Sequence, residues 1–164
     1  MPDSSSRPLS RRIQAKVMGI LNVPMRRVLG LPFPTPIGKR LMLVYLTGRR
    51  TGKQYRQPVS YVRDGAMLLT PGGGKWKLNL REDQPARIRL NGRDLYARPE
   101  IIRDPDLVEP VLEKMMAANP MVKRFVGIPR SADGRLDHDR LALAAKYGFA
   151  VVRWHLDGQS PPKI

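Results

Sequence analysis

Positive charge, glycine and a hydroxyl group meet in one short segment, residues 47–53, which reads Thr-Gly-Arg-Arg-Thr-Gly-Lys. Glycine lets the backbone approach a ligand closely, and Arg49, Arg50 and Lys53 can donate charge-assisted hydrogen bonds to an anion. Together with the Thr51 hydroxyl and the free N–H groups of a turn, they predict a cradle for phosphate or carboxylate. The spacing differs from that of a Walker loop, and no helical pattern follows. The alternative is a solvated hairpin turn with ordinary surface charge.

A second glycine-rich segment, residues 72–80, could also contact a ligand. Three consecutive glycines end at Gly74 and are followed by Lys75, Trp76 and Asn79. The Trp76 ring can stack on a ligand or pack in a core, and the Asn79 amide can hydrogen-bond the backbone of this loop. The alternative is that Trp76 anchors the core while the glycines form a flexible connection.

Other kinds of chemistry have little support in the sequence. There is no cysteine, which excludes disulfides, thiolate catalysis and thiolate metal sites, and two histidines leave little for a metal centre. The candidate carboxylate pairs, Glu82 with Asp83 and Glu109 with Glu113, are expected to be solvated, and no serine has the surroundings of a nucleophile. The sequence therefore predicts no metal site and leaves any catalytic side chain unknown.

Charge is distributed unevenly along the chain. The net charge is +16, and residues 1–63 hold 13 Lys or Arg against one acidic residue. Such a field predicts an anionic partner: nucleic acid, a membrane surface or a multiply charged small molecule. Nucleic acid is the least favoured of these, because aromatic residues that could stack on bases make up only 6% of the chain. Without a secretory signal or an apolar run of about 18 residues, the chain is expected in the cytoplasm, with peripheral membrane contact left open.

The elements that must position these segments follow from periodicity and turn signals. Residues 1–39 predict a disordered tail, a basic amphipathic helix over residues 9–31 and a proline-rich connector. This helix could pack on the domain or lie on anionic lipid. Residues 40–156 predict one α+β domain, and residues 157–164 a second tail. About six strands are expected, at 41–47, 54–63, 66–70, 86–90, 94–102 and 149–155, with helices between them. Hairpin signals at Asp64-Gly65 and Asn91-Gly92 favour an antiparallel sheet or small barrel with helices packed outside.

Taken together, residues 43–53, residues 56–65 and the run Trp76-Lys77-Leu78-Asn79-Leu80 resemble the signature of the deazaflavin-dependent nitroreductase family. The resemblance covers about residues 40–156. It implies a split β-barrel that binds coenzyme F-420, a deazaflavin with a phosphate and an oligoglutamate tail. It assigns the phosphate side to Arg49, Arg50, Thr51, Gly52 and Arg56, with Lys53 just past the matched turn. It assigns Pro58 and Val59 to the strand beside the ring, and Gly74, Lys75, Trp76 and Asn79 to the second loop. Lys77 stands where the family often has an aromatic residue.

These observations predict an oxidoreductase that transfers a hydride from reduced F-420 to an electron-poor small molecule such as a quinone, enone or nitro compound. The cofactor carries this chemistry, so no nucleophile or metal is required. The same barrel could hold FMN instead. The alternative from another class is a non-enzymatic basic barrel that binds a lipid surface or nucleic acid. Either a monomer or a homodimer fits the sequence.

Overall fold

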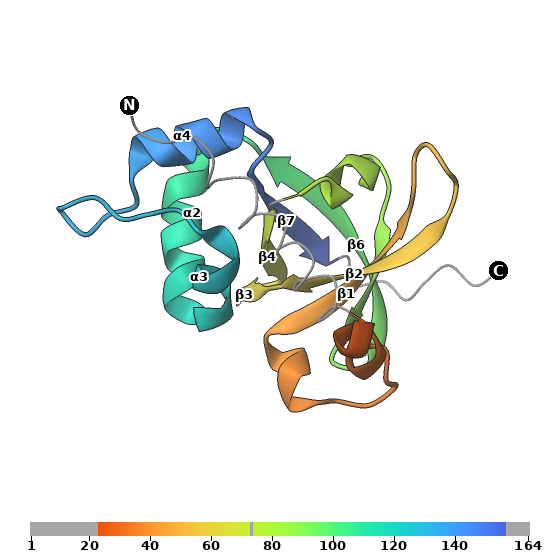
Figure 1. Cartoon of the computed structure of the whole chain (residues 1–164). Coiled ribbons are helices and arrows are strands. Elements are labelled where there is room, and N and C mark those ends of the chain that lie inside the picture. The colour runs from red at the N-terminus through yellow and green to blue at the C-terminus, as the bar shows by residue number, and fades with distance from the viewer. Residues whose placement is uncertain (1–22, 73, 157–164) are drawn as a thin grey trace, which may run out of the picture.

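A seven-stranded antiparallel sheet forms the centre of the protein and curls into a half-open barrel (Figure 1). The computed structural model describes residues 23–72 and 74–156. The strands are β1 (Leu41–Thr47), β2 (Gln54–Ser60), β3 (Val62–Asp64), β4 (Met67–Gly72), β5 (Ala86–Leu90), β6 (Arg93–Ile102) and β7 (Ala150–Leu156). Their order across the sheet is β2-β1-β5-β6-β7-β4-β3, with antiparallel pairing throughout. The predicted α+β class with a split barrel is confirmed.

Helices begin where the sequence supplies caps. Three α-helices lie entirely within the described residues: α2 (Pro105–Ala118), α3 (Pro120–Val126) and α4 (His138–Lys146). Asp104, Asn119 and Asp137 each accept a backbone N–H at the start of one of them, which satisfies a donor that the helix itself cannot pair. Two short 3-10 helices, η1 (Pro36–Lys39) and η2 (Trp76–Asn79), lie in the connections before β1 and after β4. Among the described residues, no helix is long and apolar enough to cross a membrane.

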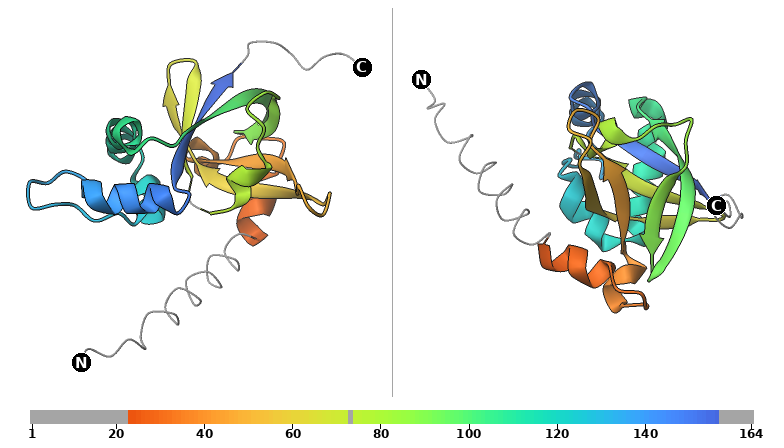
Figure 2. Two further views of the ribbon diagram at one scale, coloured as in Figure 1. Left: turned by 90° about the horizontal axis from the view of Figure 1, so that it is seen from above. Right: turned by 90° about the vertical axis from the view of Figure 1, so that its right-hand side faces the viewer.

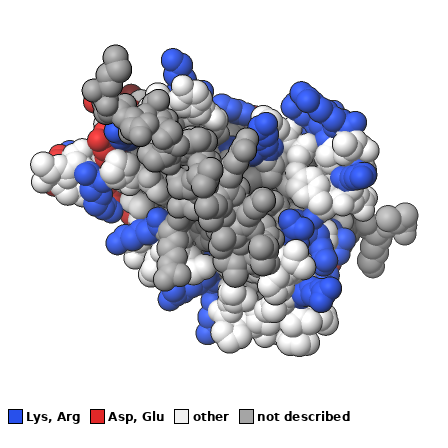
Figure 3. Space-filling model, viewed as in Figure 1, with Lys and Arg blue, Asp and Glu red and all other residues white. Residues whose placement is uncertain are grey.

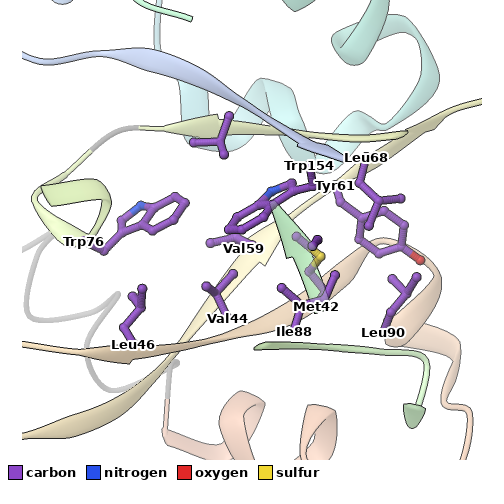
Figure 4. Packing of buried hydrophobic residues seen from close by; sticks show 12 residues of the cluster. Met42, Val44, Leu46, Val59, Tyr61, Leu68, Trp76, Ile88, Leu90 and Trp154 are labelled. Carbon is purple, nitrogen blue, oxygen red and sulfur yellow. The ribbon is translucent and has the colours of Figure 1, made fainter. Parts of the chain in front are cut away.

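Two main hydrophobic clusters lie on opposite faces of the curled sheet. The inner cluster fills the barrel with side chains such as Met42, Val44, Trp76 and Trp154 (Figure 4). The outer cluster joins β3, β4 and β7 to α2, α3 and α4, which cover one side of the barrel (Figure 2). The interior of the barrel is therefore a packed core, and ligand sites must lie at its ends or on its outer surface.

A third, smaller cluster ties the segment before β1 to the sheet. Residues 23–29 are helical, and Leu29 is buried with Leu41 and Leu43 while Met25 packs against them. This segment lies on a different side of the barrel from α2–α4 (Figure 2). The end of the predicted basic helix thus packs on the domain. The tail, helix residues 9–22 and the C-terminal tail at 157–164 lie outside the described residues.

The predicted strand over residues 54–63 is two strands, β2 and β3, so the sheet has seven strands and not six. The division falls at Tyr61, whose backbone N–H donates to Arg40 O at 3.1 Å and whose hydroxyl donates to Gly38 O at 2.8 Å. Its carbonyl accepts from Asn119 Nδ2 at 3.0 Å. These partners come from distant parts of the chain, which is why local periodicity did not indicate the break.

Candidate functional site

The predicted cradle is a tight turn between β1 and β2. Gly48 N–H donates to Lys53 O and Gly52 N–H donates to Gly48 O, both at 2.9 Å, while Lys53 N–H donates to Thr51 Oγ1 at 3.3 Å. Gly52 has a φ of +66°, a conformation that disfavours other residues. The hydroxyl of Thr51 and the backbone N–H groups of Gly48 and Lys53 are thus used within the turn, so they stabilise its shape.

The side chains of Arg49, Arg50 and Lys53 project from this turn and are exposed. Among the described residues, none of the three forms an ion pair within 4.0 Å. No acidic residue occurs in the chain between Asp3 and Asp64. The turn therefore presents three cations that no residue of the described part of the chain neutralises, a feature that an anion-binding cradle needs.

The second glycine-rich segment is held in place by two buried side chains. Trp76 is 9% exposed and packs in the inner core, as the alternative interpretation of this segment has it. Lys77 is 6% exposed, and its Nζ donates to Gly72 O at 2.5 Å and to Gly74 O at 3.0 Å. A Cβ at Gly72 would lie 2.3 Å from Lys77 Cδ, so only glycine leaves room for the lysine stem. Burial, and secondarily the charge of Arg103, lowers the pKa of Lys77 to about 8.

Asn79 joins the two segments. Its Oδ1 accepts the backbone N–H of Arg49 at 2.9 Å, and its Nδ2 donates to the Tyr55 hydroxyl at 2.5 Å. The first of these bonds connects residues 30 positions apart, at the start of the turn and at the end of η2. One amide side chain therefore fixes the position of the turn relative to the glycine-rich loop, whereas the sequence predicted a bond from Asn79 to the backbone of its own loop.

Beside this junction lies a basic cleft of about 490 Å³ between the end of β1 and the segment from η2 to β5. Its walls carry Arg49, Arg81 and Arg87 and no acidic residue. The Arg87 guanidinium lies 4.1 Å from the centre of the Tyr45 ring and pairs with Asp94 outside the cleft at 2.6 Å. The face shown in Figure 3 has Lys and Arg spread widely, while acidic residues gather at its upper left edge. The cleft is thus suited to an anion.

A second hollow, of about 590 Å³, lies next to Gly74 and is mainly apolar. It is formed by the end of α3 and by α4, and the walls include Leu143, Tyr147 and Phe149 with Arg140 as their one charged residue. Tyr147 is 81% exposed and Leu143 is 46% exposed, although both are large hydrophobic residues. Apolar side chains grouped around a hollow are typical of a ligand site. The glycine-rich loop therefore borders an apolar hollow as well as leading to the basic cleft.

The residues predicted to bind the cofactor do not all line one cavity. Arg49 and Asn79 line the basic cleft, while Arg50, Thr51, Gly52 and Lys53 lie on the adjoining turn. Arg56 pairs in register with the cleft residue Tyr45, but its Nη1 lies close to Gly30 of the N-terminal segment. Pro58 lies opposite Leu43, farther along the same face of β2. Val59 and Trp76 point into the inner core, Gly74 borders the apolar hollow, and Lys75 is exposed at the start of η2.

Arg81 and Arg87 were not predicted as site residues. Arg81 follows η2 next to two acidic residues and looked like part of a solvated loop, whereas Arg87 belongs to an alternating strand. Only the pairing of β1 with β5, through Leu43–Arg89 and Val44–Ile88, brings Arg87 to the cleft.

Comparison with known proteins gives similarity in fold. No protein-family model matches the chain, and no curated protein is similar to it in sequence. A protein of unknown function from Agrobacterium tumefaciens is 15% identical with a TM-score of 0.51, over 83% of this chain and 55% of that protein. An FAD-binding protein from Mesorhizobium loti is 13% identical with a TM-score of 0.48, over 72% and 81%. An F420 reductase is 12% identical with a TM-score of 0.42, over 81% and 93%. At these identities the likeness concerns the fold alone.

Proposed function

We propose that this protein is an oxidoreductase that binds coenzyme F-420 and passes a hydride from it to an electron-poor small molecule. The observation that carries the proposal is the Asn79 junction, which sets the cationic turn and the glycine-rich loop together beside a cleft with three arginines. These are the two segments whose order and spacing resemble the deazaflavin-dependent nitroreductase family. Flavin- and F420-binding proteins among the structural neighbours fit the same proposal.

The charge of the cleft suits F-420 better than FMN. F-420 carries several carboxylates in addition to its phosphate, whereas FMN carries one phosphate. Arg49 and Arg81 line the cleft without an ion-pair partner among the described residues, and Arg87 lines it while pairing with Asp94 outside it. Arg50 and Lys53 lie on the adjoining turn. Each charge-assisted hydrogen bond contributes about 1.5–3 kcal/mol, so two or three suffice to hold an acidic tail. One phosphate would leave most of these cations unused.

The chain's own residues supply binding and orientation. Bound reduced F-420 would supply the hydride from its C5 carbon, so the protein needs no nucleophile. The arginines of the cleft would hold the acidic tail, and Asn79 would keep the turn in place. The apolar hollow at Tyr147 would hold the acceptor, because Leu143 and Phe149 offer apolar surface to a planar quinone, enone or nitro compound.

Titration of the full-length protein with F-420, FMN and FAD tests the cofactor. Arg49→Gln keeps the backbone N–H that Asn79 binds and removes only the guanidinium, so the turn should keep its shape. We expect it to weaken F-420 binding by about tenfold to hundredfold, the equivalent of one charge-assisted hydrogen bond, and FMN binding by less. Arg98→Gln, an exposed change on β6 away from the cleft, is the matched control. No binding of any of the three cofactors, or equal affinity in Arg49→Gln, would refute the proposal.

Turnover tests the reaction. Mixed with reduced F-420 and menadione, the protein should accelerate the return of the oxidised cofactor's visible absorbance. Tyr147→Ala should raise the KM for menadione and leave F-420 affinity unchanged, because Tyr147 lines the apolar hollow and not the basic cleft. Tight F-420 binding without turnover of quinones, enones or nitroaromatics would make the protein a cofactor carrier.

A further inference from the structure

A third cavity, of about 270 Å³, lies between η2, the end of β6 and the connection from α4 to β7. Three cationic side chains line it, Arg49, Lys77 and Arg103, together with one acidic side chain, Glu82. The remaining wall is largely apolar and includes Ile101 and Phe149. The cavity shares Arg49, Leu78 and Leu80 with the basic cleft, so the two lie side by side.

Lys77 is the most unusual of these groups. It is 94% buried, yet its only hydrogen-bond partners among the described residues are the carbonyls of Gly72 and Gly74. An ammonium group has three protons, so one donor is left over. The nearby charge of Arg103 repels it. A buried cation without a counter-ion is costly, and an anion in the cavity would remove that cost.

Glu82 does not neutralise the charges of Lys77 and Arg103. Its Oε1 accepts the backbone N–H of Ile101 at 2.6 Å, which directs the carboxylate toward the strand. Its Oε2 lies 3.9 Å from Arg103 Nη1, and both side chains are well exposed, so this contact is weak. With three cations and one committed carboxylate, the cavity keeps an excess of positive charge.

We propose that this cavity binds the carboxylate of a small organic acid, with Lys77 and Arg103 as the cationic contacts. The cations favour an oxyanion, and the apolar wall at Ile101 and Phe149 favours an organic body over inorganic phosphate. A carboxylate can come from a free acid or from the acidic tail of a cofactor held in the neighbouring basic cleft. The cavity recognises the carboxylate in either case, and a titration of the F-420-saturated protein distinguishes a free acid from the cofactor tail.

Calorimetric titration of the cofactor-free, full-length protein with benzoate at pH 7 tests the site, with inorganic phosphate as the second probe. We expect benzoate to bind more tightly than phosphate. Arg103→Gln, at a side chain 66% exposed, should fold normally and weaken benzoate binding at least tenfold. Lys77→Met should do the same, with circular dichroism reporting whether it folds, and Arg98→Gln should change nothing. No heat of binding up to millimolar benzoate, or equal affinity in Arg103→Gln, would overturn the proposal.

A third titration, with protein first saturated with F-420, identifies the source of the carboxylate. Benzoate that still binds supports a free organic acid as the occupant. Benzoate that is displaced supports the cofactor tail as the source of the carboxylate at this cavity. The first titration needs no cofactor, so it tests the cavity even if F-420 fails to bind and the proposed oxidoreductase function is wrong.

Discussion

The stability of this protein should increase with pH at Lys77, in contrast to the usual effect of a lysine. The folded state lowers the pKa of Lys77 to about 8, from an ordinary value of 10.5, because the ammonium is buried and repelled by Arg103. Below about pH 8 both the folded and the unfolded chain carry the charge, and the folded state bears its full cost. Above pH 8 the folded chain releases the proton while the unfolded chain keeps it. Wherever the unfolded state binds more protons, stability rises with pH.

The magnitude follows from the two pKa values. One pKa unit corresponds to about 1.4 kcal/mol, so a shift from 10.5 to about 8 corresponds to roughly 3 kcal/mol in total. Integrated between pH 7 and pH 9.5, the contribution of Lys77 to the free energy of unfolding should rise by about 2 kcal/mol. This is a sizeable part of the stability of a typical domain, so denaturation can resolve it.

Urea denaturation of the wild-type protein and of Lys77→Met at pH 7 and pH 9.5 measures this contribution. Methionine has a similar length and no titratable group, and the other titrating residues are common to both proteins, so their contributions cancel in the difference. The chain has no cysteine whose ionisation or oxidation would complicate the alkaline measurement. Wild type should gain about 2 kcal/mol over the variant between the two pH values. The same pH dependence in both proteins would show that Lys77 titrates normally and would refute its burial as a cation.

Three further predictions, one with a matched control variant, concern other parts of the structure. Asn79→Ala removes both bonds of the junction and should lower the free energy of unfolding by about 1–3 kcal/mol in urea, and a loss below about 0.5 kcal/mol would contradict the junction. Gly92→Ala should cost more than about 2 kcal/mol, since its φ is +82° and a Cβ would lie 2.7 Å from the Phe33 backbone. Gly65→Ala, with φ +61° and open space around it, should cost only about 1 kcal/mol, and equal losses would contradict the close packing at Gly92. A protein shortened to residues 23–164 should keep its thermal stability, because Leu29 and its contacts with the sheet remain. It should lose co-sedimentation with phosphatidylglycerol vesicles, because four basic residues are removed. Unchanged sedimentation would exclude a membrane role for the removed segment.

Local signals predicted the parts of the fold that local chemistry determines. Asn91 and Gly92 form the turn between β5 and β6 with φ values of 51° and 82°, which is the left-handed pair expected of this hairpin. Asp104 caps α2 and Pro105 occupies its first turn, where a missing N–H has no cost. Each of these features depends on residues within a few positions of one another, so the sequence is enough to predict them.

Strand order and the walls of the sites depend on contacts between distant segments. The pairing of β1 with β5 brings Arg87 beside Tyr45, and no spacing rule in the sequence indicates that partner. The burial of Lys77 likewise could not be predicted from the sequence, because it depends on Gly72 having no side chain and on the path of the glycine-rich loop. Both residues are identified as candidate ligand contacts only from the three-dimensional arrangement of the sheet and the glycine-rich loop.

The division of the matched motifs between core and surface determines which variants are informative about binding. Val59 and Trp76 belong to the inner core, and truncation of a buried tryptophan costs about 3–5 kcal/mol, so their loss would weaken any ligand site by unfolding the barrel. Arg49 is different, because its backbone N–H donates to Asn79 while its exposed side chain has no hydrogen-bond partner among the described residues. Changing its side chain therefore alters the charge presented to a ligand and leaves the fold in place. A loss of F-420 binding in a Trp76 variant would support either a structural or a binding role, whereas a loss in Arg49→Gln supports binding alone.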